Sequence, residues 1–98
     1  MKFFYESLPL NIILKLIKEE LMTACNTTNV EIKGLLFDDG VYEDEGDGPD
    51  KDIYQMITVI ATIKGTDERH TEDYGTHQWL FEWSYNYSNF CSIMRTDQ

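Results

Sequence analysis

Basic residues are scarce in this chain of 98 residues. Eight lysines and arginines stand against eighteen aspartates and glutamates, which gives a formal net charge of −10. A surface of that charge repels nucleic acids and anionic membranes, so we exclude both as partners. The charge suits a basic protein partner. It also keeps a small protein soluble and monomeric, a role that requires no partner at all.

Cysteines and long apolar runs are also few. The two cysteines, Cys25 and Cys91, cannot build a disulfide framework, and they indicate reduced thiols in a cytosolic protein. The apolar run Leu8–Leu14 is short and leads directly into charged residues. It is therefore neither a membrane span nor the core of a signal peptide, and we expect a cytoplasmic protein.

The patterns that carry catalysis or hold cofactors are missing. His70 and His77 stand near Glu72 and Asp73, in or beside a polar loop, without the spacing of an HExxH motif or a histidine pair. We interpret both histidines as ordinary surface residues. Neither cysteine has the setting of a nucleophile, and the glycines lie among carboxylates that would repel a phosphate group. The sequence therefore predicts a protein that is not an enzyme and that binds no cofactor and no metal.

What the chain has in excess is negative charge in one segment, Asp38–Asp52. This segment holds eight of the eighteen carboxylates and one lysine. Three glycines and a proline exclude a helix or a regular strand through its middle. The β-type runs Val30–Phe37 and Ile53–Lys64 flank it, so we expect an acidic loop at the tip of a long hairpin. The loop either presents charge to a basic partner or is a solvated connection with no partner.

The same segment is also a candidate calcium site, because calcium binds clusters of carboxylate oxygens. If Gly48 takes the sixth position of an EF-hand loop, acidic residues precede it at the right positions. However, Tyr54 then stands where the loop requires glutamate. The spacing argues against an EF-hand, and a calcium or small-ligand binding domain remains the alternative from another functional class.

The rest of the chain predicts one amphipathic helix and several strands. Apolar residues at spacings of three and four predict a helix over Pro9–Cys25, and Met1–Glu6 is either a first strand or a docking arm. Gly34 predicts a bulge or a point of close packing in the strand Val30–Phe37. Strict alternation predicts a central strand over Ile53–Lys64, with both faces at least partly covered.

Two further strands are expected near the C-terminus. An aromatic stripe at period two predicts a strand over His77–Tyr87, whose aromatic face packs beneath the helix. A turn at Ser88–Asn89 leads to a last short strand, Phe90–Met94. The expected fold is therefore α+β in a single domain, residues 1–98: an antiparallel meander of four to five strands with the N-terminal helix packed on one face.

A small, strongly acidic chain with the acidic segments 38–52 and 67–73 and without a catalytic pattern resembles the bacterial immunity proteins. These neutralise nuclease toxins, including those of contact-dependent growth inhibition. The resemblance implies a monomeric, cytoplasmic antidote that binds one basic nuclease toxin and occludes its active site. Phage-encoded inhibitors, such as anti-CRISPR proteins and other nucleic-acid mimics, share this profile and are the alternative within the inhibitor class.

On this hypothesis, the partner-binding residues are the carboxylates of the acidic segments and two tyrosines that can reach an interface edge. They are Asp38, Asp39, Glu43, Asp44, Glu45, Asp47, Asp50, Asp52, Glu72, Asp73, Tyr85 and Tyr87.

Overall fold

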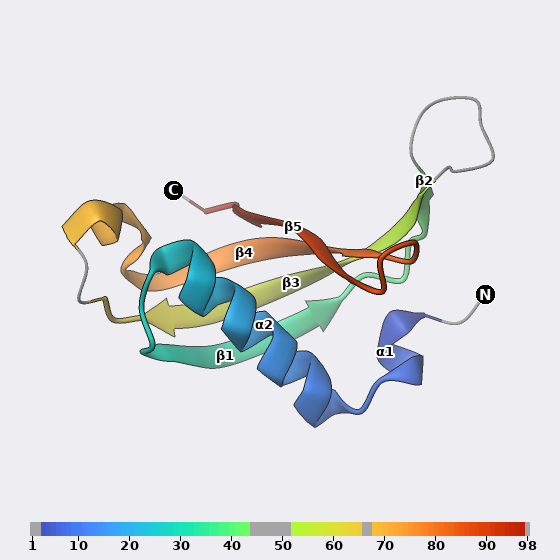
Figure 1. The fold of residues 1–98 in the computed structure, drawn as a ribbon, viewed down its shortest axis with the longest axis horizontal. Helices are drawn as coiled ribbons and strands as arrows, with labels where there is room; N and C mark the ends of the chain where they lie inside the picture. The colour runs from blue at the N-terminus through green and yellow to red at the C-terminus, as the bar shows by residue number, and fades with distance from the viewer. Residues whose placement is uncertain (1–2, 44–51, 66–67, 98) are drawn as a thin grey trace.

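The computed structural model describes residues 3–43, 52–65 and 68–97. The elements follow in the order α1 (Phe4–Ser7), α2 (Leu10–Cys25), β1 (Val30–Phe37), β2 (Tyr42–Glu43), β3 (Ile53–Ile63), η1 (Glu68–Asp73), β4 (Gly75–Ser84) and β5 (Asn89–Arg95). All pairings are antiparallel. The strand order is β1-β3-β4-β5, and β2 also pairs with β3. The predicted α+β fold, a helix with an antiparallel sheet, is confirmed (Figure 1).

Helix α2 crosses one face of the sheet (Figure 1). Its buried side chains recur every four residues, at Ile13, Ile17, Leu21 and Cys25, so they form one stripe along the helix. The helix ends at Asn26, whose left-handed backbone (φ 50°) makes the αL cap that asparagine tolerates. None of the helices in the described residues is long and apolar enough to cross a membrane.

The sheet face beneath α2 is the core of the molecule. Strand β3 is central, as predicted, because it pairs with β1 and β2 on one side and with β4 on the other. Its alternate residues are fully buried, and the aromatic face of β4 packs beside them. The buried members are Ile57, Val59, Ala61 and Ile63 on β3 and Trp79, Phe81 and Trp83 on β4.

The opposite face of the sheet carries no helix among the described residues. Its exposed apolar side chains are Leu36, Ile60 and Met94, which are 68%, 40% and 51% exposed. Thr58 and Thr62 alternate with Ile60 along β3 and are half-buried. The two faces of β3 thus differ strongly in coverage, because the chain supplies one long helix and that helix covers a single face.

The N-terminal segment contains a helix, α1, so of the two predicted alternatives the first strand was wrong. Phe4 is 2% exposed and stacks on Trp83, with ring centroids 5.0 Å apart. The backbone N–H of Phe4 also donates to Oε1 of Gln55 at 2.9 Å. The segment is too short to form a stable helix or to show a helical pattern in its sequence. Its conformation is therefore decided by two tertiary contacts: the burial of the Phe4 ring and the hydrogen bond to Gln55 on β3.

The sheet departs from regular pairing in β1 and between β4 and β5. The register shifts between Ile32 and Gly34, which confirms the predicted bulge at Gly34. Strand β4 begins two residues earlier than predicted and ends at Ser84, so the expected strand through Tyr87 was wrong. Residues 85–88 form the turn, in which Ser88 has a positive φ of 51°. Strand β5 then begins at Asn89, where the turn had been expected.

Candidate protein-binding surface

One end of the sheet gathers most of the described residues that the sequence predicts to bind a partner. There β1 ends at Phe37, opposite Ile57; Glu43 pairs with Ile53; and Ser84, the last residue of β4, pairs with Tyr54. Asp38, Asp39, Glu43 and Asp52 therefore lie at this end, together with Tyr85 and Tyr87. Asp44, Glu45, Asp47 and Asp50 lie outside the described residues.

Helix α1 adds a further carboxylate to this end, that of Glu6. The pKa of the neighbouring Tyr5 is raised, first by partial burial and then by the negative charges of Glu6, Asp39 and Asp38. Tyr5 also packs on Phe37, with ring centroids 4.5 Å apart. We call this set the acidic end, defined as Glu6, Asp38, Asp39, Glu43 and Asp52.

Asp38 has a structural role within the acidic end. Its Oδ1 accepts a hydrogen bond from the backbone N–H of Gly40 at 2.7 Å, and its Oδ2 accepts one from the hydroxyl of Tyr42 at 2.9 Å. The hydrogen bond to Asp38 is the main cause of the raised pKa of Tyr42. Asp38 thus holds the connection between β1 and β2 in place, as an aspartate at a turn commonly does.

Asp52 links two connections of the sheet. Its Oδ2 accepts a hydrogen bond from Oγ of Ser84 at 2.8 Å, and its Oδ1 accepts one from the backbone N–H of Asn86 at 3.3 Å. The carboxylate that precedes β3 therefore orders the turn after β4. Asp39 and Glu43 are exposed.

Tyrosines accompany the carboxylates. Tyr42 and Tyr54 stack with ring centroids 6.0 Å apart, and Tyr87 is 78% exposed. The hydroxyl of Tyr85 donates to Oε1 of the buried Gln55 at 2.5 Å, and burial is the largest cause of its raised pKa. Tyrosine is enriched in protein interfaces because it offers a large apolar area together with a polar group. The acidic end therefore has the composition of a protein-binding surface.

Glu72 and Asp73 lie at the opposite end of the sheet, on η1 between β3 and β4 (Figure 1). The register of β3 with β4 runs from Tyr54 at the acidic end to Ile63 beside η1. At about 3.4 Å per residue, these positions are roughly 30 Å apart. The sequence prediction placed both acidic segments in one partner-binding set, but one compact contact does not reach both.

Around η1 the structure brings together His70, which the sequence predicted to be an ordinary surface residue, and two carboxylates that it predicted to bind a partner. One ligand atom each of His70, Glu72 and Asp73 lies within 4.8 Å of the others, close enough to share a metal ion with small shifts. However, the guanidinium of Arg95 lies 3.9 Å from Oδ1 of Asp73 and donates a hydrogen bond to the carbonyl of Glu72. The arginine therefore already supplies a cation beside the Asp73 carboxylate.

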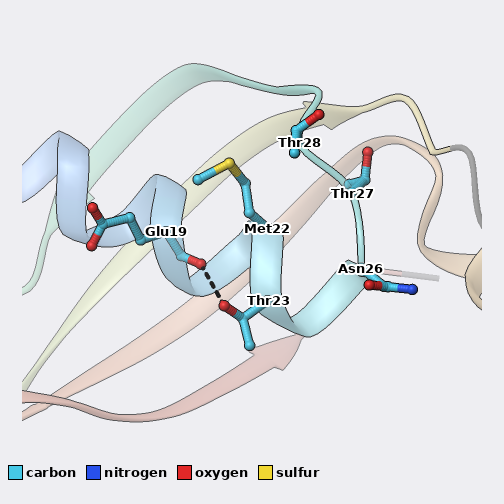
Figure 2. Close-up of a pocket in the computed structure, with 6 residues that line it drawn as sticks. All are labelled: Glu19, Met22, Thr23, Asn26, Thr27 and Thr28. Atoms are coloured by element: carbon cyan, nitrogen blue, oxygen red, sulfur yellow. Dashed lines mark hydrogen bonds between the residues drawn. The ribbon is translucent and has the colours of Figure 1, made fainter.

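An open depression of about 720 Å³ lies at the C-terminal end of α2 (Figure 2). Its lining is mostly neutral and polar: Glu19, Met22, Thr23, Asn26, Thr27 and Thr28. The hydroxyl of Thr23 donates to the carbonyl of Glu19 at 3.0 Å, and that of Thr27 donates to the carbonyl of Lys64 at 2.8 Å. These hydroxyls serve the backbone at the helix end, and the lining offers no pair of groups for acid–base chemistry.

The two cysteines form no disulfide and differ in burial, which predicts different reactivity. Cys25 is buried, and burial, with smaller effects of the charges of Asp73 and Glu72, raises the pKa of its thiol to about 11. Cys91 is exposed. Because the thiolate is the reactive form, we expect Ellman's reagent near pH 8 to label Cys91 in the folded protein and Cys25 only after unfolding. Rapid labelling of a folded Cys91→Ser variant would contradict this placement of Cys25.

The sequence analysis missed Gln55, a buried residue that connects α1 to the turn after β4. It is 1% exposed, and its Oε1 accepts hydrogen bonds from Phe4 and Tyr85. The signal was present in the sequence, because Gln55 takes an inward position of β3, in phase with Ile57 and Val59.

Comparisons of the chain with protein-family models, with curated proteins and with solved structures found no match.

Proposed function

We propose that this protein is an immunity protein that binds a basic nuclease toxin through the acidic end and occludes the active site of that toxin. The observation that carries the proposal is the meeting of carboxylates and tyrosines at one end of the sheet, in a chain with a formal net charge of −10. In this role the protein is a cytoplasmic monomer that performs no catalysis itself.

The proposed mechanism is electrostatic. Asp39 and Glu43 are exposed, and the sequence adds four more carboxylates between Glu43 and Asp52. Carboxylates pair with lysine and arginine through charge-assisted hydrogen bonds, so they take the places that substrate phosphates occupy in a nuclease. Complementary charge also raises the association rate of the two proteins. An antidote requires fast association, because an active toxin damages the cell until it is bound.

The aromatic side chains supply what charge alone does not. Exposed ion pairs contribute little to affinity, typically about 0–1 kcal/mol each. Tyrosines at the centre of an interface are among the residues that contribute most to binding. Tyr42, Tyr54 and Tyr87 stand beside the carboxylates, so the same surface offers both steering charge and apolar contact area.

A phage-encoded inhibitor of a nucleic-acid-binding defence protein would use the same surface. The two kinds of inhibitor differ in their targets. A phage-encoded inhibitor binds an effector complex that itself binds nucleic acid, whereas an immunity protein binds a toxin that damages the producing cell. The two proposals therefore separate on the identity of the captured protein and on whether that protein is toxic by itself.

The test is a pull-down from the native host with the tagged protein, washed first at low salt and then at high salt, followed by growth assays. We expect capture of one basic protein that salt releases. Expressed alone in a laboratory bacterium, that protein should arrest growth, and co-expression of this chain should restore it. A captured protein that salt does not release, or whose toxicity co-expression leaves unchanged, would contradict the proposed function.

A further inference from the structure

The face of the sheet opposite α2 carries two uncharged rows of side chains. Residues that pair directly in an antiparallel sheet project from the same face, so each row crosses the sheet from strand to strand. None of the seven residues is charged, although the chain has a formal net charge of −10. We call this set the open face. Its rows are Leu36, Thr58, Leu80 and Met94, and Gly34, Ile60 and Gln78.

A hollow lies in the open face beside the bulge of β1. Its volume is about 280 Å³, and its lining carries no charge: Gly34, Leu35, Leu36, Thr58, Ile60 and Gln78. Ligand pockets usually measure about 300–1,000 Å³, so the hollow suits one side chain better than a cofactor. A Cβ placed on Gly34 would lie 3.9 Å from the Cβ of Ile60, an ordinary contact, so a side chain fits there. We call this space the Gly34 hollow.

Exposed apolar side chains gather on the open face and at the acidic end. Eight large ones are exposed among the described residues, and six of them lie in these two regions. Such a concentration marks an interaction surface, whereas single exposed apolar residues are normal. The six are Val41, Tyr42 and Tyr87 at the acidic end and Leu36, Ile60 and Met94 on the sheet face; the other two, Leu10 and Ile12, belong to α2.

The open face adjoins the acidic end. Leu36 precedes Asp38 by two residues, and Gly34 precedes it by four, about 14 Å at 3.4 Å per residue. Tyr54 lies on the outward side of β3, and its ring stacks on that of Tyr42. A partner bound at the acidic end therefore reaches the Gly34 hollow without crossing a buried part of the fold.

The charge of the chain favours a basic protein over a second copy as the occupant. Two copies would bring two net charges of −10 together, whereas the acidic end attracts a basic partner. A standard interface uses about 20–30 residues on each side. The five residues of the acidic end and the four tyrosines beside it supply fewer than half of that number, so the contact has to extend onto a neighbouring surface.

We propose that the open face is the apolar part of the interface with the basic protein partner, and that the Gly34 hollow receives one apolar side chain of that partner. The proposal rests on the proposed function and deepens it, because it names the surface that slows dissociation. Charge at the acidic end sets the association rate, and apolar contact on the open face sets the dissociation rate.

The test is a double variant of the open face, Leu36→Ser with Ile60→Thr, assayed with the partner captured from the native host. At about 0.15 M salt, we expect its dissociation rate to rise about tenfold or more. Its association rate should change less than about twofold, because no charge is altered. The matched control is Leu10→Ser with Ile12→Thr on α2. These side chains are 56% and 37% exposed, against 68% and 40% for Leu36 and Ile60, and the control should dissociate like the wild type.

A second pair of variants tests the hollow itself. Gly34→Phe places a ring in the space that the partner's side chain would take, and it should also raise the dissociation rate about tenfold. Gly34→Ala adds only the Cβ that the site accommodates, and it should leave the rate nearly unchanged. An unchanged rate with Gly34→Phe, or equal effects of the open-face variant and the α2 control, would overturn the proposal.

The two proposals fail in different ways. A toxic, salt-released partner whose dissociation the open-face variants leave unchanged would overturn this inference and support the immunity function. A basic partner that is not toxic, but that the open-face variants release faster, would support this inference and overturn the immunity function. Capture of no basic protein would overturn both. Sedimentation of the protein alone tests the other occupant: a dimer that only the open-face variant dissociates would assign this face to a second copy and overturn the inference.

Discussion

Replacing Leu21 with alanine is expected to lower the free energy of unfolding by about 2–5 kcal/mol. Leu21 is fully buried on the stripe of α2 that faces the sheet. Removal of its side chain leaves a cavity that the surrounding side chains fill only in part. Domains of this size have a total stability of about 5–15 kcal/mol, so the loss is a large fraction of the whole. The midpoint of urea unfolding, with an unchanged slope, measures it.

The matched control makes the same substitution on the same helix. Leu10 is 56% exposed, and we expect Leu10→Ala to cost less than about 1 kcal/mol, because little apolar surface leaves water at this position. Similar losses for the two variants would contradict the packing of α2 on the sheet through the stripe that contains Leu21.

Neutralising the acidic segment is expected to slow association with the partner by about ten- to a hundredfold at low salt. The variant replaces Glu43, Asp44, Glu45 and Asp47 with the corresponding amides. Its fold should persist, because the core beneath α2 consists of apolar side chains and the substitutions remove none of them. The difference in rate should shrink between salt concentrations of about 0.01 M and 0.15 M, where the screening length falls from about 30 Å to about 8 Å. Stopped-flow mixing with the captured partner measures the rate.

The control variant removes four carboxylates elsewhere and therefore changes the net charge equally: Glu19→Gln, Glu20→Gln, Glu31→Gln and Glu72→Gln. It includes Glu72 because the sequence analysis grouped that residue with the acidic segment. We expect its association rate to fall far less. If both variants slow association equally, net charge steers the partner and the acidic end has no special part in binding.

Local patterns predicted much of the fold. Apolar residues at spacings of three and four predicted α2 to within one residue at its start, and β-type runs predicted β1 and the central strand β3. Gly34 predicted the bulge. Each of these features follows from the backbone geometry of a single element, so a short window of sequence contains its signal.

The errors fall where distant contacts decide the structure. The segment before Pro9 became a helix because Phe4 inserts beside Trp83 and bonds to Gln55, both far away in the sequence. The aromatic alternation continues through Tyr87, but β4 ends at Ser84, where the carboxylate of Asp52 orders the turn. The periodicity of apolar residues along one segment contains no information on hydrogen bonds to a distant residue such as Asp52.

For the candidate surface, too, some features follow from the local sequence and others only from tertiary contacts. The sequence by itself determined that negative charge is concentrated between Asp38 and Asp52 and that aromatics alternate through Tyr87, because these are properties of neighbouring residues. Only the tertiary structure decided that Glu6 joins the carboxylates of the acidic end, and that Glu72 and Asp73 lie at the far end of the sheet. The physical reason is antiparallel pairing, which places successive connections of a meander at opposite ends.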